Sequence, residues 1–131
     1  MLIVDDEPAL RDLLDRLLTR ERFNVWTAAG IDGALNALQA TTFAAVVLDL
    51  HLPDDRGRNR SGIEVLSFMQ VHDHLKHTPV IILTGGTLTD ADEKALWGLH
   101  AYVVNKSDGW HTILQYLKYL TSNSPLHPKP H

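Results

Sequence analysis

The sequence alternates short apolar runs with longer stretches of helical periodicity. In the stretch after the first run, Leu10, Leu14 and Leu17 recur at the spacing of one helix face, with charged residues between them. Alternating segments of these two kinds predict a parallel sheet that is covered by helices on both faces. The predicted strands are Met1–Val4, Phe23–Thr27, Ala44–Leu48, Val80–Leu83 and Ala101–Asn105.

Polar residues directly follow four of these runs. Asp5 and Asp6 follow the first run, Asp49 follows the third, Thr84 the fourth and Lys106 the fifth. We expect an α/β fold with a five-stranded parallel sheet in the flavodoxin-like order 2-1-3-4-5. Ligands of such sheets bind at the carboxyl ends of the strands, where the strand order reverses between strands 1 and 3. The acidic residues that end these two strands should therefore be neighbours in space.

The residue types at these strand ends suit phosphoryl transfer. Three adjacent carboxylates repel one another unless a cation lies between them, and oxygen ligands favour Mg²⁺. Asp49 could then attack a phosphorus atom in line, while Lys106 binds a phosphoryl oxygen and Thr84 hydrogen-bonds the product. Each residue taken alone is more commonly a helix cap or a solvated side chain. The site is favoured because all of them fall in register with their strands.

Length and composition restrict the remaining possibilities. The 131 residues suffice for one domain, which we place at residues 1–121, with a flexible tail or linker at 122–131. The net charge of −4 gives no reason to expect nucleic acid or an anionic membrane as a partner. The absence of cysteine excludes disulfides and thiolate metal sites. No apolar run approaches the roughly 20 residues of a membrane span, and we expect a cytoplasmic protein.

Four motifs resemble those of the receiver domain of two-component response regulators. They occur in the family's order and spacing, and the resemblance extends from Leu2 to about Leu120. It implies a phosphorylation-dependent signalling switch rather than an enzyme with an external substrate, apart from its own phosphorylation and dephosphorylation. The motifs are Val4-Asp-Asp-Glu-Pro8, Val47-Leu-Asp-Leu-His-Leu-Pro53, Ile82-Leu-Thr-Gly85 and Val104-Asn-Lys106.

The resemblance also implies a role for each site residue. Asp49 would be the phosphoacceptor, and Asp6 and Asp49 would bind Mg²⁺ directly. Asp5 would act mostly through water, and the backbone carbonyl of His51 would complete the protein ligands. Thr84 would be the switch hydroxyl and Lys106 the phosphoryl-binding lysine. The implied phosphodonor is a phosphohistidine on a sensor histidine kinase or on a histidine phosphotransfer protein.

The chain departs from the family pattern in the loop after Asp49. Pro53 and Gly62 stand nine residues apart, which makes this loop about five residues longer than usual. We favour a tolerated surface insertion with a tip of mixed charge. The alternative is that Arg56, Arg58 or Arg60 reaches the phosphorylated site or the donor.

Two further departures surround Lys106. Ser107 replaces the usual proline, so a trans peptide bond is expected, since a cis bond without proline costs about 3–4 kcal/mol. Val103 occupies the place of the usual switch aromatic, and Tyr102 precedes it by one residue. A step of one residue turns a strand side chain to the other face. Either the usual coupling to the aromatic is absent or a small bulge restores it.

Two other functions remain open. A pseudo-receiver would bind partners without phosphorylation, and the departures around Lys106 keep this alternative open. A haloacid-dehalogenase-like phosphatase would need a second acid where His51 stands. For three aromatic residues on the last two helices we favour a packing role, and the alternative is a partner or dimer surface; they are Trp97, Tyr116 and Tyr119.

Overall fold

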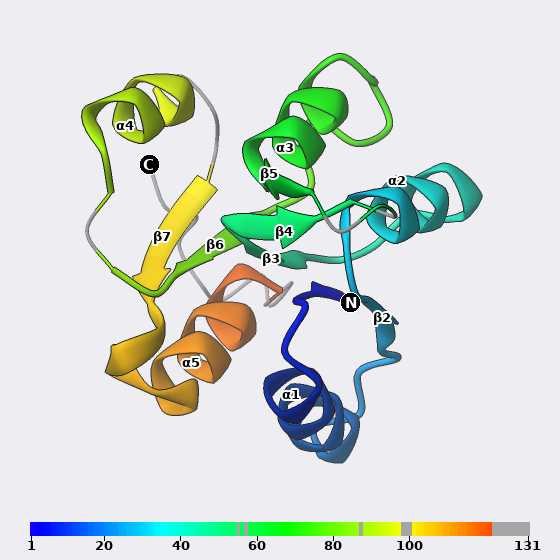
Figure 1. Cartoon of the computed structure of the whole chain (residues 1–131). Helices are drawn as coiled ribbons and strands as arrows, with labels where there is room; N and C mark the ends of the chain where they lie inside the picture. The colour runs from blue at the N-terminus through cyan, green and yellow to red at the C-terminus, as the bar shows by residue number, and fades with distance from the viewer. Residues whose placement is uncertain (55, 57, 87, 98–100, 122–131) are drawn as a thin grey trace.

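The computed structural model describes residues 1–54, 56, 58–86, 88–97 and 101–121, and its main sheet is parallel with helices on both faces (Figure 1). The strand order β2-β1-β3-β6-β7 confirms the predicted 2-1-3-4-5 arrangement. The strands of this sheet are β1 (Leu2–Val4), β2 (Trp26–Ala28), β3 (Val46–Asp49), β6 (Val80–Thr84) and β7 (Ala101–Asn105).

The pairing register explains which residues meet at the carboxyl edge of the sheet. Val4 pairs with Leu48 across β1 and β3, so Asp5 and Asp49 follow neighbouring positions. Thr84 pairs with Asn105 across β6 and β7. The second strand was predicted from Phe23 onwards but begins at Trp26. The residues before it pack partly against the core instead of pairing.

Among the described residues, four α-helices connect strands and a fifth follows the last strand, and none of them is long and apolar enough to cross a membrane. Thr89 caps α4 in a capping box with Asp92. A 3₁₀ turn, η1 (Lys106–Asp108), precedes α5, whose N-cap is Gly109. The helices are α1 (Pro8–Arg20), α2 (Ile31–Ala40), α3 (Ile63–Gln70), α4 (Asp90–Leu96) and α5 (Trp110–Leu120).

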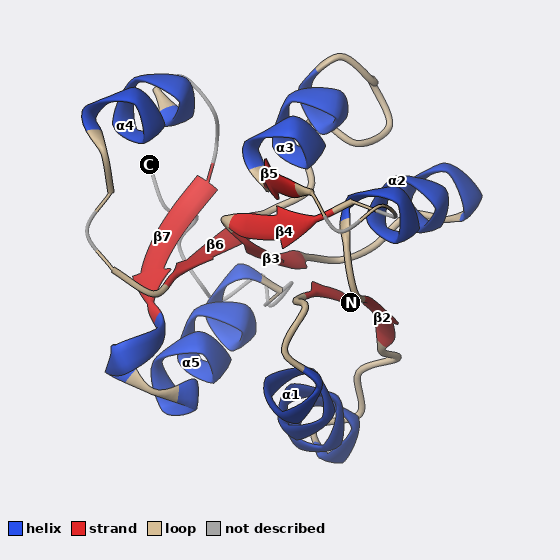
Figure 2. Ribbon diagram, in the orientation of Figure 1, coloured by secondary structure: helices blue, strands red, loops and turns tan. Residues whose placement is uncertain are grey.

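Side chains that alternate along the strands form two apolar layers, one on each face of the sheet. Leu48 packs towards α2 and α3 with Leu66, and Val47 packs towards α1 and α5 with Leu18 and Leu117. Figures 1 and 2 show α1 and α5 together on one side of the sheet, opposite α2 and α3. Strand β3 is buried along its whole length because both layers cover it.

The insertion after Asp49 forms an antiparallel hairpin that the sequence did not predict. Strands β4 (His51–Pro53) and β5 (Asn59–Ser61) pair from His51 opposite Ser61 to Pro53 opposite Asn59 (Figure 2). The buried carboxylate of Asp54 closes the hairpin by accepting the backbone N–H groups of Arg56 and Arg58, each at 2.9 Å. The described residues of the insertion are therefore arranged around one carboxylate.

The hairpin returns to the sheet at Gly62. The Gly62 N–H donates to the Leu50 carbonyl at 2.6 Å. A Cβ atom added to Gly62 would overlap the Asp49 carbonyl oxygen, which is a backbone atom and cannot rotate away. Close packing at Gly62 thus fixes the backbone of Asp49.

We expect Gly62→Ala to destabilise the protein by about 1–3 kcal/mol, because the methyl group forces the hairpin away from the end of β3. Chemical denaturation measures this change in the free energy of unfolding. Gly85→Ala is the matched control, since nothing lies within 4 Å of a Cβ atom there. Equal stabilities of the two variants would contradict the proposed close packing.

Candidate functional site

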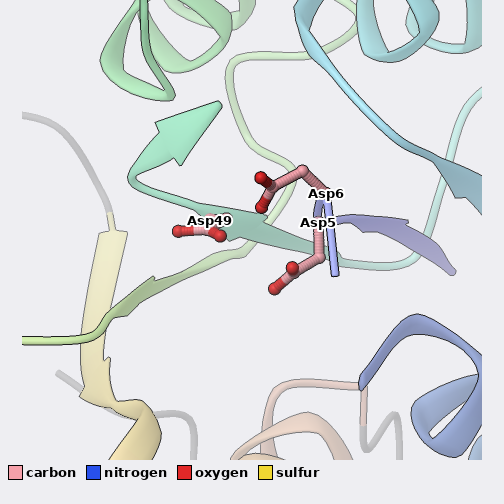
Figure 3. Close-up of side chains that lie close together, drawn as sticks. All are labelled: Asp5, Asp6 and Asp49. Carbon is pink, nitrogen blue, oxygen red and sulfur yellow. The ribbon is translucent and has the colours of Figure 1, made fainter. Parts of the chain in front are cut away.

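Three aspartates converge at the carboxyl edge of the sheet. Asp5 and Asp6 leave the end of β1, and Asp49 ends β3 (Figure 3). One carboxylate oxygen of each lies within 4.8 Å of the others. Asp5 and Asp49 are buried, whereas Asp6 is exposed. The structure confirms the predicted proximity of these residues; their chemical roles stay predictions.

Backbone groups fix the two buried carboxylates. Asp5 Oδ1 accepts the Glu7 N–H at 2.8 Å. The Asp5 backbone carbonyl accepts a guanidinium N–H of Arg11 at 2.7 Å. Asp49 Oδ1 accepts the His51 N–H at 3.1 Å. Each carboxylate thus has one oxygen held by the adjoining loop, and its other oxygen lies near the ammonium group of Lys106.

The second oxygen of Asp5 is the electrostatically strained atom of the site. Asp5 Oδ2 is buried and has no hydrogen bond among the described residues, although Lys106 Nζ lies at ion-pair distance, 3.3 Å. The contact contributes attraction without hydrogen-bond geometry. Burial raises the pKa of Asp5; the Glu7 N–H opposes this shift and the nearby Asp49 adds to it.

These three carboxylates fit a divalent cation. All the candidate ligand atoms are oxygens, one of them is buried without a hydrogen bond, and one carboxylate opens to solvent. Such a set suits a hard cation that keeps several waters. The cluster could therefore hold a metal ion. Nothing in the contacts of His51 places its carbonyl oxygen at the cluster, so its role as a ligand stays a prediction.

Lys106 reaches the cluster despite the missing proline. Its ammonium nitrogen lies 2.9 Å from Asp49 Oδ2 and 2.9 Å from Glu7 Oε1. Burial acts to lower the pKa of Lys106, but the hydrogen bonds to Asp49 and Glu7 outweigh it and the pKa is raised. The peptide bond to Ser107 is trans, as expected, since the described residues contain no cis bond.

Asn105 shapes the turn that follows Lys106. The Asn105 side-chain oxygen accepts the Ser107 N–H at 2.9 Å and the Ser107 hydroxyl at 2.8 Å. Gly109, with φ +86°, then donates its N–H to the Lys106 carbonyl. Neither Asn105 nor Glu7 was predicted as a site residue. The only sequence signal for them is their place next to Lys106 and to Asp5-Asp6.

Thr84 lies buried at the end of β6, and its hydroxyl is engaged with its own loop. Thr84 Oγ1 donates to the Gly86 carbonyl at 3.0 Å and accepts the Gly86 N–H, with 3.3 Å between the Gly86 nitrogen and Thr84 Oγ1. The structure places the residue at the predicted edge, next to Asn105 in the register. The Thr84 hydroxyl is therefore bonded to Gly86 and not to a carboxylate of the described residues.

The aromatic residue near Lys106 lies on the α5 side of the sheet. Tyr102 stands 6.0 Å from Tyr116 of α5, measured between ring centroids. Strands β6 and β7 pair without interruption from Val80 opposite Ala101 to Thr84 opposite Asn105, so no bulge restores the family's aromatic position. Val103 is 42% exposed and occupies that position.

Comparison with known proteins gives consistent matches. The model of a family described as "Response regulator receiver domain" matches residues 1–117. The transcriptional regulatory protein SrrA of Staphylococcus aureus is 35% identical over 105 residues, which are 79% of this chain and 40% of SrrA. The chain thus spans less than half the length of this relative.

Two solved structures share the fold. The signal receiver domain of a histidine kinase from Syntrophus aciditrophicus superposes with a TM-score of 0.79 at 19% identity, covering 99% of this chain and 95% of that one. The response regulator TrrA of Thermotoga maritima, solved in complex with Mg²⁺ and BeF, has a TM-score of 0.74 at 30% identity, covering 91% and 96%. The first match supports the fold, and the second adds sequence similarity.

We expect Asp5→Asn to stabilise the metal-free protein at neutral pH. Because the pKa of Asp5 is raised in the folded state, the wild type loses stability as the pH rises from the ordinary carboxyl pKa to the raised pKa. The amide removes this penalty. Mg²⁺ should stabilise the wild type by about 2.7 kcal/mol at a hundredfold excess over Kd, and should stabilise the variant far less.

Thermal unfolding with and without Mg²⁺ measures both effects. Asp12→Asn on the exposed face of α1 controls for the change in net charge. A metal-free Asp5→Asn protein that unfolds below the wild type would contradict the assignment of strain to Asp5.

Proposed function

The chain belongs to the response regulator receiver domain family, and on that premise we propose that it is a signalling switch phosphorylated on Asp49. The observation that carries the assignment is the buried Asp49 carboxylate, which shares its cluster with two acids and has Lys106 Nζ 2.9 Å from its Oδ2. A carboxylate with this arrangement is both held in place and charge-compensated.

The proposed reaction follows from these positions. An Asp49 oxygen attacks the phosphorus of a phosphohistidine, the phosphorus–nitrogen bond breaks, and the imidazole nitrogen leaves with the electron pair. Lys106 binds an oxygen of the transferred group. Thr84 exchanges its bond with the Gly86 carbonyl for a bond to the product. Attack of water on the acyl phosphate later returns Asp49 to its carboxylate form.

We propose that Mg²⁺ is the cation of the acidic cluster. Asp6 and Asp49 would bind it directly, Asp5 mostly through water, and the His51 backbone carbonyl would be the remaining protein ligand. The ion would neutralise charge on the transferring oxygens. The oxygen-only ligand set supports this choice, and TrrA was solved with Mg²⁺.

The proposed partners follow from this chemistry. The donor is a sensor histidine kinase or a histidine phosphotransfer protein in the cytoplasm. A second copy of the chain could dock on the face of the last helices, where Trp97, Tyr116 and Tyr119 are exposed. Activity beyond self-phosphorylation and self-dephosphorylation is not proposed, since His51 stands where a phosphatase of the haloacid-dehalogenase type needs an acid.

We expect acetyl phosphate with Mg²⁺ to produce one acid-stable, base-labile adduct on the chain, detected by intact mass. Asp49→Asn should abolish the adduct because the amide is a poor nucleophile. A wild-type chain that acquires no adduct would favour the pseudo-receiver alternative. Multiple turnover of phosphomonoesters would instead indicate a phosphatase.

Replacing the three hairpin arginines with glutamine should leave the rate of phosphorylation within about twofold of wild type; they are Arg56, Arg58 and Arg60. Arg58 pairs with Asp54 at 2.6 Å and Arg60 pairs with Glu64, so these two cations are engaged within the hairpin and α3. The test uses acetyl phosphate and then a phosphohistidine donor. A larger loss with both donors would favour the alternative that an arginine reaches the phosphoryl group.

A further inference from the structure

We propose that Glu7 is the positioning residue for Lys106: its carboxylate holds the ammonium group beside Asp49, where a phosphoryl oxygen arrives. The inference deepens the proposed function and rests on it for the phosphoryl group. The contact joins residues 99 positions apart in the sequence, at 2.9 Å between Lys106 Nζ and Glu7 Oε1. The family resemblance assigns no role to Glu7.

Hydrogen bonds on either side of Lys106 fix its backbone independently of its side chain. The Asn105 oxygen holds the turn from one side, and the bond from the Gly109 N–H to the Lys106 carbonyl closes it from the other. This fixes where the side chain starts. A lysine stem has four flexible carbons, so the position of the ammonium group still depends on what it contacts.

Glu7 is well placed to supply that contact. Its backbone N–H is bonded to Asp5, and its carbonyl accepts the Arg11 N–H at 3.1 Å in the first turn of α1. The main chain of Glu7 is thus held at both polar groups, and Pro8 follows it. Its side chain is 60% exposed, so the carboxylate contacts Lys106 from the solvent side of the site.

The contacts of Lys106 divide into two kinds. Asp5 and Asp49 belong to the acidic cluster that fits a cation, whereas Glu7 does not. A divalent ion drawn to the cluster competes for the charge of Asp5 and Asp49 and repels the ammonium group. Glu7 then remains as the carboxylate that keeps Lys106 at the site.

Glu7 also allows the change of partners that the reaction needs. An ammonium group has three N–H donors, and in the structure two of them bond to Glu7 and Asp49. When a phosphoryl group is attached to Asp49, the donor that faced Asp49 can move to a phosphoryl oxygen. The bond to Glu7 need not break, so the cation stays in place through the transfer.

The direct test is nuclear magnetic resonance on the full, isotope-labelled chain. A scalar coupling between Lys106 Nζ and the side-chain carboxyl carbon of Glu7 should be present and should persist when Mg²⁺ is added. Lys106→Met identifies the lysine signal by its loss. In Glu7→Ala the ammonium signal should be present without Mg²⁺ and should broaden or disappear when the ion is added.

The kinetic test compares phosphorylation rates with acetyl phosphate. We expect Glu7→Ala to be about fivefold slower, which is the effect of losing one exposed ion pair. Glu7→Gln keeps an oxygen acceptor and should recover part of the rate. Asp12→Asn, on the exposed face of the helix that begins directly after Glu7, controls for the loss of a negative charge, and thermal unfolding checks that each variant is folded.

Three outcomes would overturn the role of Glu7. The coupling could be absent with Mg²⁺, Glu7→Ala could match the wild-type rate, or both Glu7 variants could be faster, as expected if Glu7 only repels the donor. A wild-type chain that accepts no phosphoryl group overturns the proposed function instead. The coupling to Lys106 is measured without phosphorylation and still decides whether Glu7 holds the lysine.

Discussion

Like charges meet at one edge of this sheet because parallel strands all end there, and the site depends on how that repulsion is compensated. The register places Asp5 beside Asp49, and both are buried. Lys106 supplies a positive charge to each of them. One oxygen of Asp5 is nevertheless left without a hydrogen bond among the described residues. The apo fold therefore retains an electrostatic cost that a cation can remove.

The sequence sufficed for the sheet and for the acidic cluster because both follow from local patterns. Buried parallel strands are apolar throughout, the α/β alternation predicts a parallel sheet, and the flavodoxin-like order 2-1-3-4-5 is one of the two common orders of such sheets. Once β1 and β3 are neighbours, Asp5 and Asp49 must be close. The same reasoning placed Lys106 at this edge and correctly anticipated its trans bond. The residue types and their register suggested phosphoryl transfer to Asp49, and the family resemblance added the individual Mg²⁺ ligands and the phosphohistidine donor.

The features that sequence reasoning missed depend on contacts between distant or polar groups. The β4–β5 hairpin lacks an apolar alternation, and its turn is closed by the carboxylate of Asp54, whose burial is a property of the folded chain. Glu7 and Lys106 lie 99 residues apart in the sequence, and the folded sheet brings them into contact.

The burial of α4 differs from that of the strands beside it. No residue of α4 is buried, and a capping box with Thr89 holds its first turn, whereas β3 and β6 are covered on both faces. In terms of hydrogen exchange, the amides of α4 should exchange through local opening and those of β3 only when the whole domain unfolds. The phosphorylation proposed for Asp49 would thus fall in the part of the chain that we expect to exchange most slowly, whereas α4 should be able to rearrange at little cost.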